Sequence, residues 1–290
     1  MQPLTFGLNV STSAGPGADP VRDARAAEAL GFDFVSASDH PSGSHPTFET
    51  WTMLTWICAA TERIGVASRV LSIPFRSPAL VAKMAESLDR LSGGRLILGL
   101  GAGATDHELR GFGLPVPSSR VKIDGLDDAL RVIRGLWTEP AFSYRGSVYT
   151  TDTATMEPKP ARHIPIWLGT FGDRALSVTG RLADGWIPSL GYAPPDKLAL
   201  MRHKVLAAAD SAGRGPEAVT CALNVEIAVV ERDDARTEVV VGPVDKLVTR
   251  LSEFVALGFN AFNLMPIGDP LVDQIELLAS EVLPKVRAMA

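Results

Sequence analysis

The chain has 290 residues, of which 46% are hydrophobic and 21% charged, and its formal net charge is −5. This composition excludes an intrinsically disordered chain, and it lacks the clustered Lys and Arg side chains that nucleic-acid binding needs. No apolar run reaches the roughly 18 residues of a spanning helix and the start shows no signal peptide, so we expect a soluble cytoplasmic protein with a small-molecule substrate and neither a nucleic-acid nor a membrane partner.

Short β-branched apolar runs alternate with longer amphipathic stretches along the chain. The first helix has clear boundaries, with Asp19 as N-cap, Pro20 in its first turn and Gly31 at its end. The predicted strands are 5–10, 34–38, 64–72, 96–101, 166–169, 185–188, 220–230 and 261–266. The predicted helices are 20–30, 50–61, 78–91, 123–137, 174–182, 197–212, 244–257 and 271–289.

Eight strand–helix units in succession predict an α/β fold with a parallel sheet, and eight is the number of strands that closes a TIM (β/α)8 barrel. A doubly wound open sheet shows the same alternation and remains the alternative. Because barrels commonly exceed 200 residues as one unit, we expect residues 1–290 to form a single barrel domain.

One segment interrupts this alternation. Residues 139–162 lie between the fourth helix and the fifth strand, and they contain a predicted hairpin around Arg145-Gly146 followed by a proline-rich stretch. A connection of about 25 residues is long and often functional. The segment is either a functional loop or a flap that covers one edge of the barrel.

Function in a barrel gathers at the C-terminal ends of the strands. That rule selects Asn9 and the stretches 38–40, 72–76, 99–103, 169–174 and 189–192. Within this set, Asp39-His40 is the sharpest pair, because a carboxylate can fix an imidazole tautomer and histidine transfers protons near neutral pH. The alternative is a helix-capping Asp beside a buried, hydrogen-bonded His.

The sequence GTFGDR at 169–174 runs from a strand end into the start of a helix. Free backbone N–H groups and the helix dipole favour an anion at such a place, and Arg174 adds a positive charge. We therefore expect phosphate binding here, against the alternative of an ordinary first helical turn with a solvated Arg.

The glycine-rich GLGAG at 99–103 is a weak nucleotide motif, because it is not GxGxxG followed by a spaced acid. Its glycines instead allow a ligand ring to approach the backbone closely. Two cysteines, Cys58 and Cys221, make neither a disulfide framework nor a zinc site. The histidines lack metal-ligand spacing, since HEL at 107–109 is not HExxH, so we predict no metal.

Four stretches resemble the bacterial luciferase-like family of flavin and deazaflavin oxidoreductases. They are ALGFDFVSASDH at 29–40, the run 61–103 with its R-x-P turn, LSGGRL connection and GxGAG loop, PIWLGTFGDRALSVTGRLADGWIPS at 165–189, and GPVDKLVTRLSEFVALGFNAFNLMP at 242–266. The resemblance spans about residues 5–285 in the family's order. It implies a TIM-type barrel that binds reduced FMN or the deazaflavin coenzyme F420 at the strand C-termini.

The same resemblance assigns roles around the ring. The third strand would carry a bulge with a non-proline cis peptide within Ser68-Arg69-Val70, where small residues are typical of the family and this chain has Arg. Asp39 would bind the polar edge of the ring, and His40 would lie beside the hydride-transfer carbon. Ala102 and Gly103 would border the ring and the ribityl chain. The phosphate would be held by Gly169, Thr170, Gly172, Arg174, Ser189 and Gly191.

One departure from the family's pattern bears on the substrate. The sugar-phosphate dehydrogenase branch carries an acidic residue where this chain has Ala104, which argues against sugar-phosphate oxidation. His107 and Glu108 are candidate pocket residues without an assigned role. The chain also lacks the lid loops of the larger monooxygenases, and only 139–162 is placed in the sequence to act as one.

Three functional hypotheses follow. The leading one is an F420-dependent oxidoreductase that moves a hydride between the deazaflavin and a small organic substrate, with His40 transferring the proton. The second is an FMN-dependent monooxygenase supplied with reduced flavin by a separate reductase. The third is a non-catalytic flavin-binding protein. Barrels of this type often pair through their second and third helices, so Trp51, Met53 and Trp56 are candidate residues of a homodimer interface.

Overall fold

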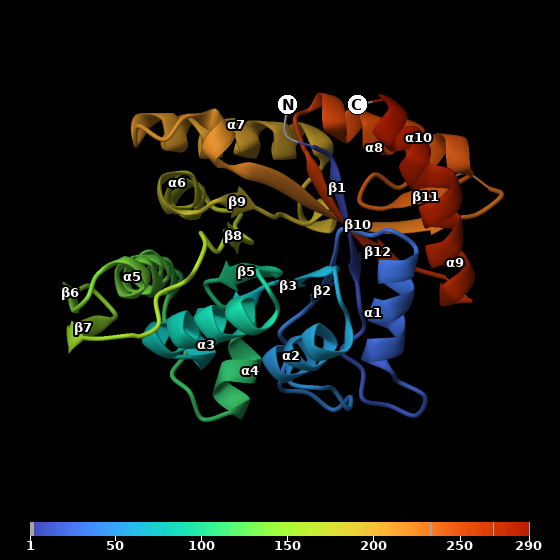
Figure 1. Ribbon diagram of the computed structural model, residues 1–290. Coiled ribbons are helices and arrows are strands. Elements are labelled where there is room, and N and C mark those ends of the chain that lie inside the picture. Colours follow the sequence, from blue (N-terminus) through green and yellow to red (C-terminus); the bar gives the residue numbers. More distant parts are fainter. Residues whose placement is uncertain (1–2, 233, 269, 290) are drawn as a thin grey trace.

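Eight parallel strands close into a barrel in the computed structural model, which describes residues 3–232, 234–268 and 270–289 (Figure 1). In order around the barrel they are β1 (Thr5–Asn9), β2 (Phe34–Ala37), β3 (Gly65–Ser68), β5 (Leu96–Gly101), β8 (Ile166–Leu168), β9 (Gly185–Trp186), β10 (Thr220–Val229) and β12 (Ala261–Pro266). Pairing of β10 with both β9 and β12, and of β12 with β1, completes the circle. The predicted TIM barrel is confirmed, and the open sheet is excluded.

Helices surround the strands on the outside of the barrel (Figure 1). They are α1 (Pro20–Ala29), α2 (Thr50–Ala60), α3 (Pro78–Leu91), α5 (Ser119–Thr138), α6 (Asp173–Leu182), α7 (Pro195–Ser211), α8 (Val244–Ala256), α9 (Leu271–Leu277) and α10 (Leu283–Met289). The Asp19 side chain accepts a hydrogen bond from the Arg22 amide at 2.9 Å, which confirms it as the N-cap of α1. The expected helix 271–289 contains a π-helical turn, Leu278–Val282, between α9 and α10.

Several short elements escape sequence prediction. They are α4 (Asp106–Gly111), β11 (Val240–Gly242), which pairs with the end of β10, and the 3-10 turns η1 (Ile73–Phe75), η2 (Leu190–Tyr192) and η3 (Pro216–Ala218), whereas β4 (Leu71–Ser72) falls within the predicted strand 64–72. Each is too short to show a hydrophobic period, which is the main signal for an element in a sequence. Among the residues described, no helix has both the length and the apolar character needed to span a membrane.

The expected third strand, 64–72, is interrupted. Its two parts, β3 and β4, both pair with β5, and the Arg69–Val70 peptide bond between them is cis. Gly99 of β5 makes this interruption sterically feasible, because a Cβ there would lie only 1.8 Å from the Ser68 carbonyl oxygen. The expected bulge is therefore present, and at Gly99 the glycine serves the approach of the neighbouring strand rather than that of a ligand.

The lower part of the barrel interior is filled by apolar side chains from different strands. Phe34 of β2 and Trp167 of β8 meet edge to face with ring centroids 5.7 Å apart, and they join Ala67, Ala222 and Ala261 in one buried cluster. Such layers of inward-pointing side chains make the interior of a TIM barrel a packed core rather than a pore. Any ligand must therefore bind above this layer, at the mouth.

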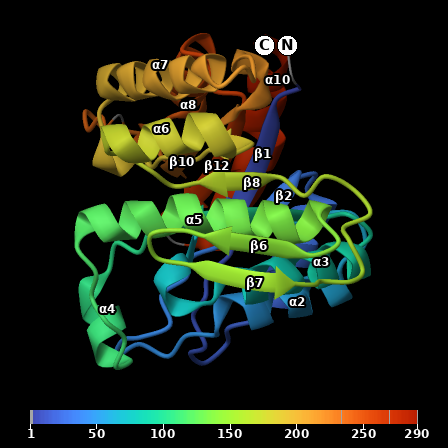
Figure 2. The same ribbon diagram turned by 90° about the vertical axis from the view of Figure 1, so that its left-hand side faces the viewer.

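The inserted segment forms a hairpin on the outside of the molecule. Its strands β6 (Phe142–Arg145) and β7 (Thr150–Ala154) pair antiparallel, so the expected hairpin is confirmed with a later second strand. Figure 2 shows it lying along the outer side of α5. Buried Asp128 of α5 accepts hydrogen bonds from the Tyr144 hydroxyl at 2.8 Å and the Val148 amide at 2.6 Å. These contacts hold the hairpin as a flap on the barrel edge.

We predict that Asp128→Ala lowers the free energy of unfolding by about 1–3 kcal/mol, because it leaves hairpin donors without an acceptor. Burial and the hydrogen bond to Asp128 raise the pKa of Tyr144 to about 12, so the variant should also bring this phenol's ionisation to lower pH. Urea unfolding and an ultraviolet pH titration measure the two effects. Asp127→Ala is the matched control, since Asp127 makes surface ion pairs with Arg131 and Arg181 and should cost about 1 kcal/mol or less. An equal loss in both variants would contradict this account of the hairpin.

Candidate functional site

A cavity of about 980 Å³ opens at the C-terminal ends of the barrel strands. This volume lies within the usual range for small-molecule and cofactor sites. Eleven of the thirteen residues to which the sequence gave a catalytic or coenzyme-binding role line it, namely Asp39, His40, Arg69, Val70, Ala102, Gly103, Gly169, Thr170, Gly172, Arg174 and Ser189. Ser68 and Gly191 are not among the lining residues. The Ser68 hydroxyl instead donates to the Gly99 carbonyl and accepts from the Gly99 amide, and Gly191 is exposed.

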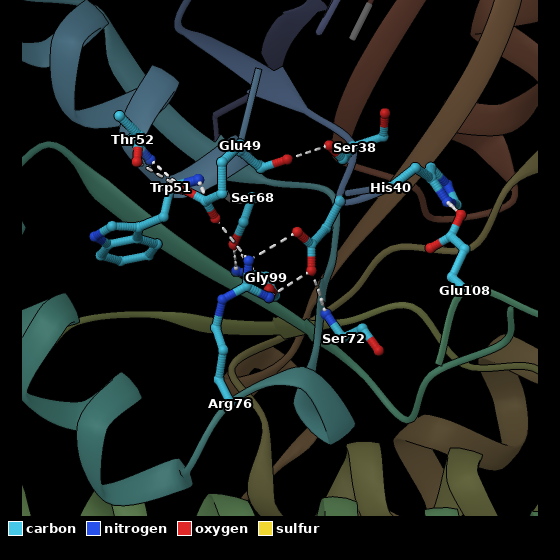
Figure 3. Close-up of polar contacts among 12 residues, drawn as sticks. Ser38, His40, Glu49, Trp51, Thr52, Ser68, Ser72, Arg76, Gly99 and Glu108 are labelled. Atoms are coloured by element: carbon cyan, nitrogen blue, oxygen red, sulfur yellow. Dashed lines mark hydrogen bonds and ion pairs between the residues drawn. The ribbon is translucent and has the colours of Figure 1, made fainter. Parts of the chain in front are cut away.

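The loop after β2 pairs His40 with an acid from the short helix α4. His40 Nδ1 lies 2.9 Å from Glu108 Oε1, and Figure 3 shows the two side chains facing each other. The His40 side chain is exposed at the cavity, whereas Glu108 is buried. A carboxylate accepts hydrogen bonds, so the contact suits the imidazole tautomer that carries its proton on Nδ1 and offers Nε2 as an acceptor.

Glu108 keeps one oxygen unused. Its Oε2 is buried and has no hydrogen-bond partner among the residues described, and the side chain forms part of the cavity wall. A buried polar atom without a partner carries a free-energy cost of about 1–3 kcal/mol. Natural proteins retain such atoms mainly where they serve a ligand or a reaction. Glu108, for which the sequence gave no role, is thus joined to the His40 side chain that the sequence singled out.

Asp39, next to His40 in the chain, is held by arginine. Its carboxylate accepts from Arg76 Nη1 at 2.7 Å and Nη2 at 2.9 Å, and from the Ser72 amide at 2.9 Å (Figure 3). Arg76 also donates to Glu49 at 2.7 Å, and Glu49 caps the N-terminus of α2. Burial opposes ionisation of Arg76, but its hydrogen bonds and opposite charges outweigh burial and raise its pKa. Asp39 therefore fixes the loops after β2 and β4; its predicted contact with a ring edge stays a prediction.

The N-terminus of α6 presents unpaired backbone amides to the same cavity. Gly172 is the N-cap residue without a side-chain cap, and the Leu176 amide donates to its carbonyl as the helix begins. A Cβ built on Gly172 would meet no atom within 4 Å, so the space before the helix is open. Arg174 lines the cavity as expected, but its guanidinium contacts Asp124 of α5. The backbone amides, more than this side chain, make the place suited to an anion.

Comparison of the sequence with known protein families identifies relatives of this chain. A family model described as luciferase-like monooxygenase matches residues 4–263. The chain belongs to the luciferase-like monooxygenase family. It is 30% identical to a protein from Microbacterium testaceum named F420-dependent glucose-6-phosphate dehydrogenase, over 99% of this chain and 82% of that protein. The resemblance inferred from the sequence is confirmed at the level of the family.

Solved structures of other proteins share the fold. An F420-dependent secondary alcohol dehydrogenase, in complex with an F420–acetone adduct, superposes with a TM-score of 0.88 at 20% identity, over 98% of this chain and 99% of that one. A monooxygenase from Streptomyces bottropensis superposes with a TM-score of 0.84 at 19% identity, over 97% and 99% of the two chains. At these identities the likeness establishes the barrel alone, which occurs both in an F420-dependent dehydrogenase and in a monooxygenase.

Sequence reasoning named Glu108 as a pocket residue without a role and Arg76 as the end of a selected stretch, but it found the partner of neither. Glu108 lies in α4, a helix too short to be predicted. Asn224, which lines the cavity from β10, was not named. A signal for Asn224 existed, because an amide between Leu223 and Val225 in a strand is unusual in a buried position.

Metal and thiol chemistry find no support in the described part of the chain. It holds no group of three or more His, Cys, Asp or Glu side chains placed to bind a metal ion. Cys58 and Cys221 are both buried and unpaired, and neither lines the cavity. Burial raises the pKa of each thiol, which disfavours the reactive thiolate.

We predict that Arg76→Met lowers the free energy of unfolding by about 3–5 kcal/mol, because Asp39 would remain buried and ionised without its partner. Denaturant unfolding measures the loss. Arg63→Met serves as the control, since Arg63 pairs with Glu62 at the surface and should contribute about 1 kcal/mol or less. The double variant Asp39→Asn/Arg76→Met should recover part of the stability. A loss of less than about 1 kcal/mol in the single variant would contradict the structural role of the pair.

Proposed function

We propose that the chain is a coenzyme F420-dependent oxidoreductase that acts on a small organic substrate. Three observations support this proposal together: the His40–Glu108 pair at the cavity, the open amides of α6 in the same cavity, and the 30% identity over almost the whole chain to a protein named for F420 dependence. The His40–Glu108 contact is the main support, because the coenzyme transfers only the hydride and the protein must supply a group that transfers the proton.

The residues present fit this coenzyme. The α6 N-terminus and Ser189 offer donors for a phosphate group, and the cavity volume accommodates a tricyclic ring with part of its tail. The ring would be held between the backbone at Arg69–Val70 and the segment Ala102-Gly103. Gly103 has a φ of +86° there, a conformation that suits glycine and allows the chain to turn away from the cavity. Bound F420 supplies the hydride acceptor or donor.

The chain's own part in the reaction is proton transfer and positioning. When an alcohol is oxidised, Nε2 of His40 would accept the hydroxyl proton while the hydride passes from the substrate carbon to the coenzyme. In the reverse reaction, Nε2 would return the proton to the substrate oxygen. Glu108 holds the proton on Nδ1, stabilises the positive charge that forms on the imidazole, and fixes the ring orientation. Glu108 is therefore a positioning residue, whereas His40 would contact the substrate.

The outer hairpin also favours this proposal over FMN-dependent oxygenation. Residues 139–162 were the only segment placed in the sequence to act as a lid over an oxygen adduct, and none of them lines the cavity. Hydride transfer from a deazaflavin needs no such shield against oxygen, although it still benefits from exclusion of water. The flap position of the hairpin is therefore consistent with the simpler chemistry.

The coenzyme assignment is tested by binding. We expect F420 to bind to the purified protein in a fluorescence titration, and FMN to bind more weakly in the parallel titration. Turnover is then followed by F420 absorbance without oxygen, with a panel of alcohols, aldehydes, imines and activated alkenes. Clear binding of FMN without binding of F420, together with oxygen-dependent turnover of reduced FMN, would refute the proposal and favour the monooxygenase.

The proton-transfer assignment is tested by variants. His40→Ala should lower kcat by about 10²- to 10⁴-fold, because it removes the general acid–base group, while the F420 dissociation constant stays unchanged. His45→Ala, which changes an exposed histidine outside the cavity, is the matched control. Unchanged kcat in His40→Ala would refute the role of His40.

Glu108→Gln separates positioning from structural support. It should lower kcat by about tenfold or more, and less than His40→Ala does, because the imidazole loses its charge partner. The same change removes a buried carboxylate with an unpaired oxygen, so the free energy of unfolding should stay equal or rise. A lower free energy of unfolding, with a loss of kcat no larger than the loss of folded protein, would mean that Glu108 is a structural residue only.

A further inference from the structure

Arg69 places a positive charge in the wall of the cavity. It follows β3 directly, its amide donates to the Ala37 carbonyl of β2 at 2.8 Å, and its half-buried side chain lines the cavity. The guanidinium Nε donates to Asn9 Oδ1 at 3.0 Å. Within the described part of the chain, Arg69 takes part in no ion pair, and its two terminal nitrogens make no hydrogen bond. Burial lowers its pKa, against weaker opposing effects of Tyr192 and Glu226.

A chain of polar side chains crosses the barrel above its apolar layer, beside this arginine. The Ser36 hydroxyl lies 3.5 Å from Asn9 Oδ1 and donates its one proton to Asn263 at 2.7 Å. Asn263 donates to Asn224 at 2.9 Å, and Asn224 donates to Ser189 at 3.1 Å. Both Asn263 and Asn224 use their oxygen and their nitrogen. These partners are neutral, so no carboxylate among the residues described competes with a ligand for Arg69.

The other basic groups of the cavity differ from Arg69 in their partners or position. Lys122 is paired with Asp106, and Arg174 with Asp124. Lys197 is exposed at the rim. Arg69 is thus a cation that is partly removed from water and held by a neutral amide, and within the described residues no carboxylate pairs with its terminal NH₂ groups. A guanidinium in this state binds an oxyanion through two parallel hydrogen bonds.

Around the barrel, Arg69 lies between the proton-transfer group and the proposed phosphate site. It follows β3, which is one strand from β2 and His40, and two strands from β8 and the open amides of α6. Its Nε reaches Asn9 at the end of β1, which is four strands from β8. The hydrogen bond to Asn9 therefore directs the guanidinium toward the His40 side of the mouth, and an anion bound there would lie on that side.

We propose that Arg69 selects substrates that carry an oxyanion, a carboxylate or a phosphate ester, next to the group that is oxidised or reduced. The proposal rests on the proposed function for the reaction itself, and it narrows the substrate class to organic acids or phosphorylated compounds. Asn9 acts as the positioning residue for Arg69.

Binding of simple probes tests the proposal without a known substrate. Calorimetric titrations use benzoate and phenyl phosphate as oxyanion probes and benzamide as the neutral isostere of benzoate, with the protein both free and loaded with F420. For the wild-type chain we expect an oxyanion to bind about 10- to 100-fold more tightly than benzamide, as a charged hydrogen-bonded pair provides. The tighter of the two oxyanions identifies a carboxylate or a phosphate substrate.

Arg69→Met keeps the apolar stem and removes the charge, so the preference over benzamide should disappear. Arg69→Lys should retain part of it, because the charge remains while the two-pronged geometry is lost. Asn9→Ala should weaken the oxyanion about fivefold through poorer orientation, and Arg63→Met at the surface should change nothing. Circular dichroism and the unfolding midpoint establish that the variants fold.

Two results would overturn the proposal. The first is an unchanged preference for oxyanions in a folded Arg69→Met variant. The second is a large loss of F420 affinity in that variant with the oxyanion preference retained, which would assign Arg69 to the coenzyme. Failure of F420 to bind the wild-type protein would instead refute the proposed function, while the titrations of the coenzyme-free protein would still decide whether Arg69 binds oxyanions.

Discussion

The approach of β3 to β5 determines how the mouth of the barrel is built. Ser68 bridges the amide and the carbonyl of Gly99, and any side chain at Gly99 would collide with the Ser68 carbonyl. Because the two strands are locked together at this point, the chain that follows must leave the regular sheet before β4 rejoins it. This departure brings Arg69 and Val70 to the cavity wall, where Val70 packs over Gly101 and Gly169.

Two buried carboxylates beside this mouth, Asp39 and Glu108, differ in their hydrogen-bond partners and therefore in what their charges can do. Asp39 has both oxygens engaged by Arg76 and Ser72, so its charge is neutralised and stabilises the surrounding loops. Glu108 has one oxygen on His40 and the other without a partner in the described structure. The residue next to the histidine in the chain is thus mainly architectural. The residue that contacts it in space is the one poised to influence its protonation.

A conserved type of barrel can serve different chemistry because specificity lies in the few side chains at its mouth. This chain shares its fold with both F420-dependent and oxygenating proteins. Its own features are Ala104 in place of an acidic residue, a hairpin that packs outside the barrel, and Arg69 as a cation held by neutral amides. That Ala104 disfavours sugar-phosphate oxidation stays a prediction from the sequence, and a relative is named for that activity. A phosphate ester bound by Arg69 would have to belong to another class of compound.

The sequence by itself determined the alternation of strands and helices, the number of barrel strands and the edge at which function gathers. These features depend on hydrophobic periodicity and capping, which are local, and eleven of the predicted site residues line one cavity for that reason. Tertiary structure alone decided the pairing of His40 with Glu108, of Asp39 with Arg76 and of Arg69 with Asn9, because each joins residues 37 to 68 positions apart. No local pattern encodes such contacts; they arise only when closure of the barrel brings the ends of different strands together.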